Sequence, residues 1–487
     1  MINKINKLSL FLFVFLGIFL IYKYNQDLHL IHISFIYILF ILSSTFVILP
    51  FFKIDQFDNL PLFILVNLYF LFCYVCCFLF NKYGLFFDRF DAADYANAIN
   101  ILFIGYIFFV FGYFLSNFFL RKFQRKEFKT LNCNEKEILV IGLLLLISNI
   151  IFYYIIKIQN YVPAIHQVKY PTLLFGIGLT FQYIIITKNK KFYFRFILLP
   201  TLILIPIFYE LVSGAYSFPF MILFLLFVYY VFLTKKINII PFLILSLLFV
   251  FIHAGKYDYR KLTWNKKSNQ FYDEKVNFLK KSSTFFDMYL KRVPNRYEYF
   301  FLIQKDKRFD TPTDRLQRRI FHSLWSLLIV RQKTPESIPY WKGYSYKILS
   351  SKIIPRIFWK NKPSDRLGNE FGHRYNVLST KTDKTNHDGN TSWNMPVLNE
   401  FYVNFGTIGV VNGMFMLGII YNLITKLFSI RNKLNLECTF AFFLFVPLFF
   451  LESHLSLIFG ALIQSYVFSL FLSFFLIFLL RKSKLLK

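Results

Sequence analysis

The sequence predicts an all-α polytopic membrane protein with about twelve transmembrane helices, both termini in the cytoplasm and one large extracytoplasmic loop. Three observations support this. Hydrophobic residues make up 56% of the 487 residues, including 68 Phe. Apolar runs as long as a membrane-spanning helix recur along the chain, and basic residues collect after every second run. We therefore expect transmembrane helices 1–9 within residues 1–255, the large loop at 256–404 and helices 10–12 within 405–487.

The apolar runs define the expected spans. The first run follows Lys4 and Lys7 and resembles a signal peptide, but no small-residue cleavage site comes after it. We therefore expect it to remain as an uncleaved first span. In chain order the expected spans are residues 8–22, 29–50, 60–80, 98–120, 138–157, 171–187, 194–212, 217–233, 238–254, 405–424, 438–453 and 456–480.

The charges of the short loops predict the orientation. After the fourth span, residues 121–129 carry Arg or Lys at five positions, and basic residues also follow the sixth, eighth, tenth and twelfth spans. The odd-numbered short loops are weakly basic, neutral or acidic, as at residues 88–94. Since Lys and Arg are retained on the cytoplasmic side, the even-numbered exits and both termini are expected there.

The loop at 256–404 is hydrophilic and is expected to contain helices. Long translocated loops do not follow the positive-inside rule, so its basic composition agrees with an extracytoplasmic location. Thr311 and Pro312 predict a helix start. The apolar residues that follow share one helical face, which would lie on the membrane surface or pack on the bundle. Two other segments are expected: amphipathic helix over 271–304, broken at Pro294, and irregular loop over 361–395.

Composition also excludes several classes of site. The net charge of +30 is spread over loops without a basic soluble domain, which argues against nucleic-acid binding. The anionic partners to expect are membrane lipid headgroups and a phosphorylated lipid carrier. Three of the five cysteines lie in one apolar span, so we interpret them as buried apolar residues. The outer loop has no Asp-x-Asp pair and no two-His spacing, so we expect no metal or cofactor.

Titratable residues lie near the predicted outer ends of the spans. They include Glu210, His253, Glu452 and His454. Ionisable groups near membrane depth are costly and often mark a functional site, although an interfacial position with the side chain reaching water is the competing interpretation. A Gly-x-x-x-Gly pattern at Gly409 and Gly413 is expected to let another helix approach closely.

The segment from Lys352 to Gly409 is the richest in candidate residues. Its arginines are always-charged forks that suit phosphate and pyrophosphate, and aromatic residues among them could stack on sugar rings. Pro355 and Pro363 bracket a turn that would fix Arg356. A solvated basic loop is the competing interpretation. The candidates are Arg356, Trp359, Lys362, Arg366, His373, Arg374, His387, Glu400 and Asn404.

Part of this segment is similar to a known family. The run Tyr344-x-Tyr346, Ile354-Pro355-Arg356-x-x-Trp359-x-x-Lys362-Pro363 is followed by Glu400-x-x-x-Asn404-Phe405-Gly406-x-x-Gly409. It resembles the Wzy family of O-antigen and related oligosaccharide repeat-unit polymerases, and the span count and loop position match as well. Many members carry an Arg in a Ser-Gly-x-Arg-like turn before a mid-chain span, where this chain has Tyr216.

The resemblance implies a metal-independent glycosyltransferase in the bacterial cytoplasmic membrane. Its substrates would be glycans linked to undecaprenyl pyrophosphate, and its partners would include a chain-length regulator and a flippase. Positive charge on the leaving pyrophosphate and a general base at the acceptor hydroxyl are needed. We expect Arg356, Glu400 and His373 as catalytic residues, with His387 as another candidate base. Expected substrate-binding residues are Trp359, Lys362, Arg366, Arg374, His387, Asn404 and Glu210.

Three other functions remain open at this point. A ligase that moves finished glycan from the lipid to another acceptor would have a similar layout. A polysaccharide flippase or transporter would show internal repeats, mid-bilayer polar residues and short loops. In a structural membrane subunit without chemistry, Arg356 would be dispensable.

Overall fold

A computed structural model shows an almost entirely helical protein. It describes residues 60–75, 90–120, 129–158, 166–187, 194–236, 238–263, 278–292, 312–352, 354, 359, 366–378, 393–428, 434–460 and 462–482. Over these ranges the only β feature is one isolated bridge between Asn132 and Asn435. The all-α class predicted from the sequence is therefore confirmed for the described part of the chain.

Five helices among the described residues are long and apolar enough to cross a membrane. The protein is therefore membrane-embedded, while the total of about twelve spans remains a prediction. The expected spans at 8–22 and 29–50 lie outside the described residues. The five are α5 (Ala92–Phe119), α6 (Glu135–Asn149) with η5 (Ile150–Ile155), α9 (Ser217–Thr234), α16 (Val397–Leu427), and α18 (Leu455–Phe459) with α19 (Leu462–Lys482).

The remaining apolar runs also form helices close to the expected positions. A chain in lipid cannot leave its backbone N–H and C=O groups unpaired. Apolar segments within the membrane therefore form helices, in which these groups bond to one another. These helices are α3 (Leu62–Phe70) with η3 (Leu71–Val75), α7 (His166–Ile186), η8 (Phe194–Leu198) with α8 (Leu199–Val212), α10 (Ile239–Thr263), and α17 (Leu436–Phe445) with η12 (Val446–Phe449).

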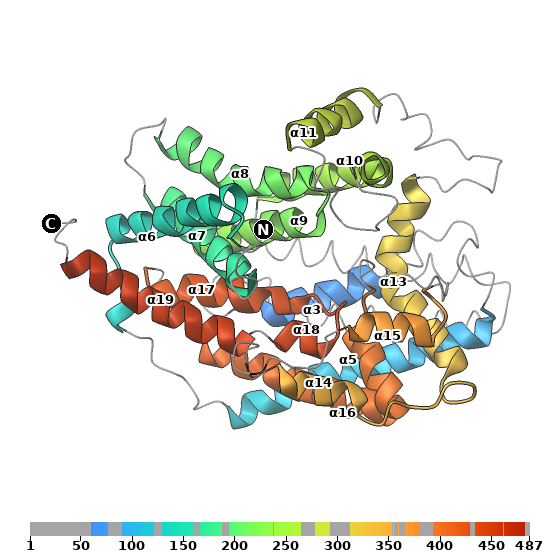
Figure 1. Cartoon of the computed structure of the whole chain (residues 1–487). Coiled ribbons are helices and arrows are strands. Elements are labelled where there is room, and N and C mark those ends of the chain that lie inside the picture. Colours follow the sequence, from blue (N-terminus) through green and yellow to red (C-terminus); the bar gives the residue numbers. More distant parts are fainter. Residues whose placement is uncertain are drawn as a thin grey trace.

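The closest helix pair is α5 with α16, which run side by side along the lower part of the molecule (Figure 1). Small residues allow this approach. A Cβ at Gly112 would overlap the Phe415 carbonyl oxygen, and one at Gly418 would overlap that of Phe109. The Gly409–Gly413 pattern has a different use from the one expected, because both glycines face Phe401 of their own bent helix.

The expected cytoplasmic ends of several spans lie together. Arg481 in the last turn of α19 pairs with Glu137 of α6 at 3.0 Å and donates to the Asn132 carbonyl oxygen at 2.7 Å. Asn435, at the start of α17, donates to Asn132 at 2.7 Å. In Figure 1 the end of α19 lies at the left, away from α13 (Pro312–Lys333) and α15 (Leu367–Arg374) at the right. The assignment of this shared end to the cytoplasmic side remains a prediction.

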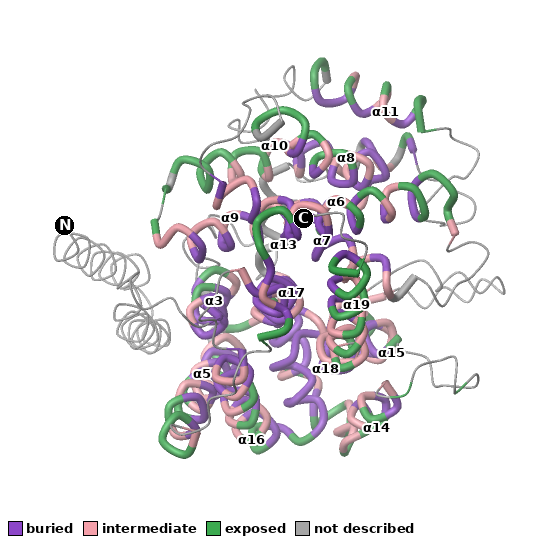
Figure 2. The backbone as a smooth tube through the Cα atoms, turned by 90° about the vertical axis from the view of Figure 1, so that its left-hand side faces the viewer, coloured by how far each residue is buried: buried purple, intermediate pink, exposed green. Residues whose placement is uncertain are grey.

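Helix α13 begins at Pro312, as predicted, and crosses the bundle ends. It packs against η3, α5, α10 and α16. Its apolar residues Leu324, Leu327 and Leu328 are fully buried, so this half of the helix packs on the bundle and does not rest on lipid. Figure 2 shows the same contrast across the molecule, with buried segments inside and much of α19 exposed.

The rest of the large loop differs in part from expectation. The prediction of amphipathic helix over 271–304 is confirmed in its middle by α11 (Phe278–Asp287) and η9 (Met288–Arg292), while the predicted break at Pro294 lies outside the described residues. The prediction of irregular loop over 361–395 is wrong at α15. Two glycines made that helix hard to predict locally. It forms because Leu367 and Phe371 are completely buried, and because Gly368 packs so closely on the Trp393 carbonyl oxygen that a Cβ there would overlap it.

Candidate functional site

The site predicted from the sequence centres on a break in α16. The helix loses its regular geometry at Phe405 (φ −144°, ψ 20°) and Gly406 (φ 62°, ψ −147°). That conformation of Gly406 is essentially restricted to glycine. A Cβ at this position would also lie 2.6 Å from the Tyr340 hydroxyl. The glycine in the Asn-Phe-Gly element is therefore required by both backbone conformation and space.

Asn404 connects the broken helix to a preceding loop. Its Oδ1 accepts a hydrogen bond from the Gly343 N–H at 2.9 Å, and its Nδ2 donates to Ser345 Oγ at 2.8 Å. The same Nδ2 also donates to the Glu400 carbonyl oxygen at 2.8 Å. The backbone adds bonds from Trp341 to Val403 and from Lys342 to Asn404, at 2.9 and 3.1 Å. Asn404, for which the sequence predicts substrate binding, is buried and fixes residues 341–345.

Glu400 lies one turn earlier and is completely buried. Its Oε2 accepts a hydrogen bond from the Leu455 N–H at 2.7 Å, which joins α16 to the turn before α18. In the same turn, His454 Nδ1 lies 2.8 Å from Ser456 Oγ. Burial, and then the charge of Glu400, raise the pKa of Tyr346. A carboxylate, an imidazole and a phenol thus gather where the bundle meets α14 (Tyr344–Ser351).

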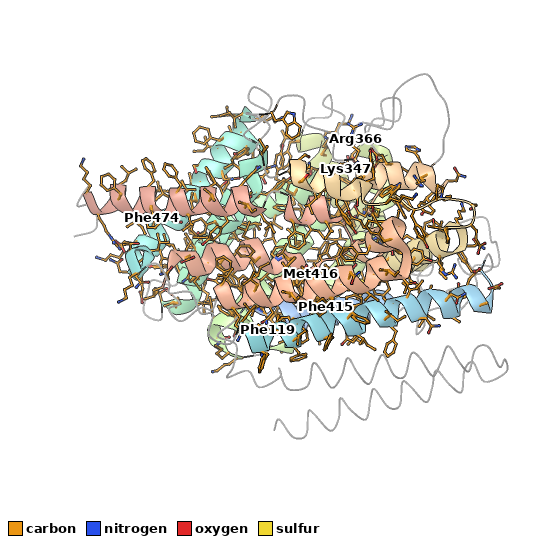
Figure 3. All side chains as sticks on the ribbon, turned by 90° about the horizontal axis from the view of Figure 1, so that it is seen from below. Phe119, Lys347, Arg366, Phe415, Met416 and Phe474 are labelled. Atoms are coloured by element: carbon orange, nitrogen blue, oxygen red, sulfur yellow. The ribbon has the colours of Figure 1, made fainter. Side chains whose placement is uncertain are left out.

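Helix α15 carries three charged residues at four-residue spacing, which places Arg366, Glu370 and Arg374 along one side. Arg374 Nη2 donates to the Pro339 carbonyl oxygen at 2.5 Å, and its guanidinium lies 5.8 Å from the ring centroid of Trp341. Arg366 is exposed at the start of the helix, at the edge of the molecule (Figure 3). Arg374 therefore borders the loop that Asn404 fixes.

Glu370 and His373 complete the polar side of α15. Partial burial, and then the neighbouring Glu370 carboxylate, raise the pKa of Tyr344. Sequence reasoning noticed Glu370 in this segment but assigned it no role, and its four-residue spacing from two arginines is the signal that could have suggested one. His373, an expected catalytic residue, is half-buried on the same helix.

The other predicted residues of this segment are only partly placed. Trp359 is 38% exposed. Arg356, Lys362 and His387 lie outside the described residues, so their roles stay predictions. Within the described ranges, no three His, Cys, Asp or Glu side chains form a group that could hold a metal ion.

Glu210 belongs to a separate buried centre formed by η5, α7 and α8. Its Oε1 accepts from Lys169 Nζ at 2.9 Å and from the Tyr154 hydroxyl at 3.1 Å. The Lys169 ammonium also lies 4.5 and 5.1 Å from the ring centroids of Tyr154 and Tyr170. Sequence reasoning found the carboxylate and missed its lysine partner, which stands just before an apolar run.

The turn before α9 receives an arginine from another helix. Arg260 of α10 donates from Nε and Nη2 to the Gly214 carbonyl oxygen, at 3.1 and 2.7 Å. Its guanidinium carbon lies 5.7 Å from the ring centroid of Tyr216. The turn at Gly214 and Tyr216 has no arginine in its own sequence, but Arg260 of α10 places its guanidinium against it.

Comparison with known proteins adds a family without an assigned activity. Residues 324–487 match the sequence model of a domain of unknown function, DUF8712. This stretch runs from the middle of α13 to the end of the chain, and includes α14, α15 and the broken helix α16. No curated protein and no solved structure matches the chain.

Proposed function

We propose that this protein polymerises oligosaccharide repeat units carried on undecaprenyl pyrophosphate, at the outer face of the bacterial cytoplasmic membrane. The observation that carries the proposal is the junction of α14, α15 and α16. There Arg374 borders a fixed loop, Arg366 stands exposed at the start of α15, and Glu400 is buried in the first turn of α16. The exposed charge of Arg366 beside a membrane-embedded body supports the proposal, since a lipid-linked pyrophosphate substrate requires an anion-binding group there.

The residues that carry the family resemblance also build this junction. Asn404 fixes the loop before α14, Gly406 permits the helix break, and Gly409 makes room for Phe401. Glu400 joins the same helix to the turn before α18. The motif from Glu400 to Gly409 therefore has a structural role in this chain, because it shapes the loop beside the charged residues of α15.

The proposed reaction is a displacement at the anomeric carbon of the donor sugar. An acceptor hydroxyl forms the new glycosidic C–O bond while the bond from that carbon to the pyrophosphate oxygen breaks. The leaving pyrophosphate takes the bonding electrons, and a base takes the hydroxyl proton. Arg366, and Arg356 from the same segment, would stabilise the growing negative charge on the pyrophosphate.

Two candidates for the base differ in access. His373 is half-buried on α15 and its Nε2 atom has almost no accessible surface, so substrate could reach the imidazole only after a local shift. Glu400 has no exposed surface, so an acceptor hydroxyl could reach its carboxylate only if the packing around it opened. In both cases the chain supplies the base and the positive charge from its own side chains.

The decisive experiment measures glycan chain length on gels, in a strain that expresses each variant in place of the wild type. We would compare Arg356→Ala and Arg366→Ala with Lys347→Ala, an exposed basic residue of α14 (Figure 3). Protein levels in the membrane would be measured in parallel. Loss of the ladder with one capped repeat unit remaining is the result expected for the two arginine variants only.

Two outcomes would overturn the proposal. An unchanged ladder in both arginine variants would remove the basic segment from the mechanism. Loss of all surface glycan, including the single capped unit, would indicate ligation or export in place of polymerisation.

A further inference from the structure

The loop before α14 holds two aromatic rings at the surface. Tyr344 is 42% exposed and Trp341 is half-buried. Their ring centroids are 5.8 Å apart and the planes meet at 66°, so the rings form two angled walls and not a closed stack. Tyr344, the more exposed of the two, can therefore offer a ring face to a ligand that lies against the loop, with Trp341 at its side.

These rings are fixed before any ligand arrives. The N–H groups of Trp341, Lys342 and Gly343 all donate to residues 403 and 404, at 2.9, 3.1 and 2.9 Å. An ordinary exposed loop leaves such groups to water. A platform that is already ordered loses little conformational entropy on binding, which favours affinity.

Charged planar groups stand beside both rings. Arg374 lies 5.8 Å from the centroid of Trp341, and the Glu370 carboxylate lies close enough to the Tyr344 hydroxyl to raise its pKa. A sugar ring has apolar C–H faces and a rim of hydroxyl groups. Aromatic faces suit the first, and a carboxylate acceptor with a guanidinium donor suits the second. Aromatic anchoring in the membrane interface would explain the rings, but gives no reason for Glu370 and Arg374 beside them.

We propose that Trp341 and Tyr344 form a sugar-binding platform on which a carbohydrate ring of the repeat unit stacks, with Glu370 and Arg374 binding its hydroxyl groups. This inference rests on the proposed function, since it takes the repeat unit as ligand. It adds a subsite for the glycan, distinct from the arginines assigned to the pyrophosphate. Trp341 and Glu370 lie outside the segments that carry the family resemblance.

The test measures binding of a soluble glycan to the purified full-length protein in lipid nanodiscs. The probe is the repeat-unit oligosaccharide released by mild acid from the surface polysaccharide of the source organism. Titration calorimetry and saturation-transfer NMR would compare wild type with Trp341→Leu, Tyr344→Leu and Tyr344→Phe. Ser350→Ala, an exposed change on α14 away from the rings, is the matched control.

Loss of an aromatic anchor from a binding site weakens affinity by about tenfold or more. We therefore expect that loss in both Leu variants, a much smaller change in Tyr344→Phe, and none in Ser350→Ala. Equal affinity in wild type and the Leu variants would overturn the platform, as would absence of glycan binding to the wild type. Weaker quenching of the Trp341→Leu variant by brominated lipids, with glycan affinity unchanged, would identify a membrane anchor instead.

The platform and the polymerase proposal can fail separately. If the Leu variants bind glycan and extend the ladder normally while Arg356→Ala stops it, only the platform is wrong. If the Leu variants lose glycan binding but Arg356→Ala and Arg366→Ala leave the ladder unchanged, the glycan site stands and polymerisation is wrong.

Discussion

The buried pair between Lys169 and Glu210 allows a quantitative test of how the bundle handles charge. We expect Lys169→Met and Glu210→Gln each to destabilise the protein strongly, and the double variant to cost less than either single change. The side chains are 10% and 4% exposed and 2.9 Å apart. Removing one partner therefore leaves the other charged group in a poorly solvated site.

The expected size follows from this geometry. Breaking a buried ion pair by removing one partner costs about 3–5 kcal/mol, because the remaining charge is uncompensated. The Met variant additionally loses contacts between the ammonium and two aromatic rings, each worth roughly 0.5–2 kcal/mol. The double variant has no unpaired charge. The amide that replaces the Glu210 carboxylate in that variant would keep an acceptor for the Tyr154 hydroxyl, so we expect a cost of only about 1–3 kcal/mol, from the imperfectly bonded amide.

Unfolding of the purified protein in mixed detergent, followed by circular dichroism as the denaturing detergent increases, would give the stabilities of all four proteins. Glycan chain length would be measured on the same variants. Two results would refute the reasoning: single variants that each cost less than about 1 kcal/mol, as for a solvated pair, or a double variant whose cost equals the sum of the singles.

Three further changes test other features. Gly406→Ala should destabilise by about 1–3 kcal/mol, because its backbone conformation excludes a side chain, whereas the neighbouring exposed Thr407→Ala should change the unfolding midpoint little. Arg260→Met removes two charged hydrogen bonds to one carbonyl; a loss of about 1.5–3 kcal/mol is expected, and an unchanged unfolding midpoint would contradict it. Arg481→Gln breaks the pair with Glu137, where the arginine is 48% exposed, so thermal melts should show a loss of at most about 1 kcal/mol that shrinks in high salt.

The sequence predicted the helices well and their tertiary connections poorly. Apolar length and loop charge are local properties, so most spans within the described residues begin and end near their expected positions. Helix α15 was missed because its stability comes from burial against a segment more than 20 residues away, which its Gly-rich sequence does not reveal. Lys169 and Glu210 were not paired for the same reason, as they are separated by 41 positions.

The candidate site shows a similar division. The motif from Glu400 to Gly409 was found, because residue type and spacing are visible in one sequence. Its physical use was not, since Asn404 and Glu400 bond to loops 50 or more residues away. Residue type also gave no indication that Glu400 would be completely buried, which bears directly on its expected role as a base.

The break at Phe405 and Gly406 has a consequence for how such proteins can diversify. It divides α16 into an outer part, where Glu400 and Asn404 hold neighbouring loops, and an inner part, where Gly418 lies against Phe109 of α5. Changes in the outer part, such as insertions that reshape the ligand surface, need not propagate into the register of the α5 contact. Evolution could therefore replace the recognition layer to suit a new polysaccharide while the membrane scaffold is inherited unchanged.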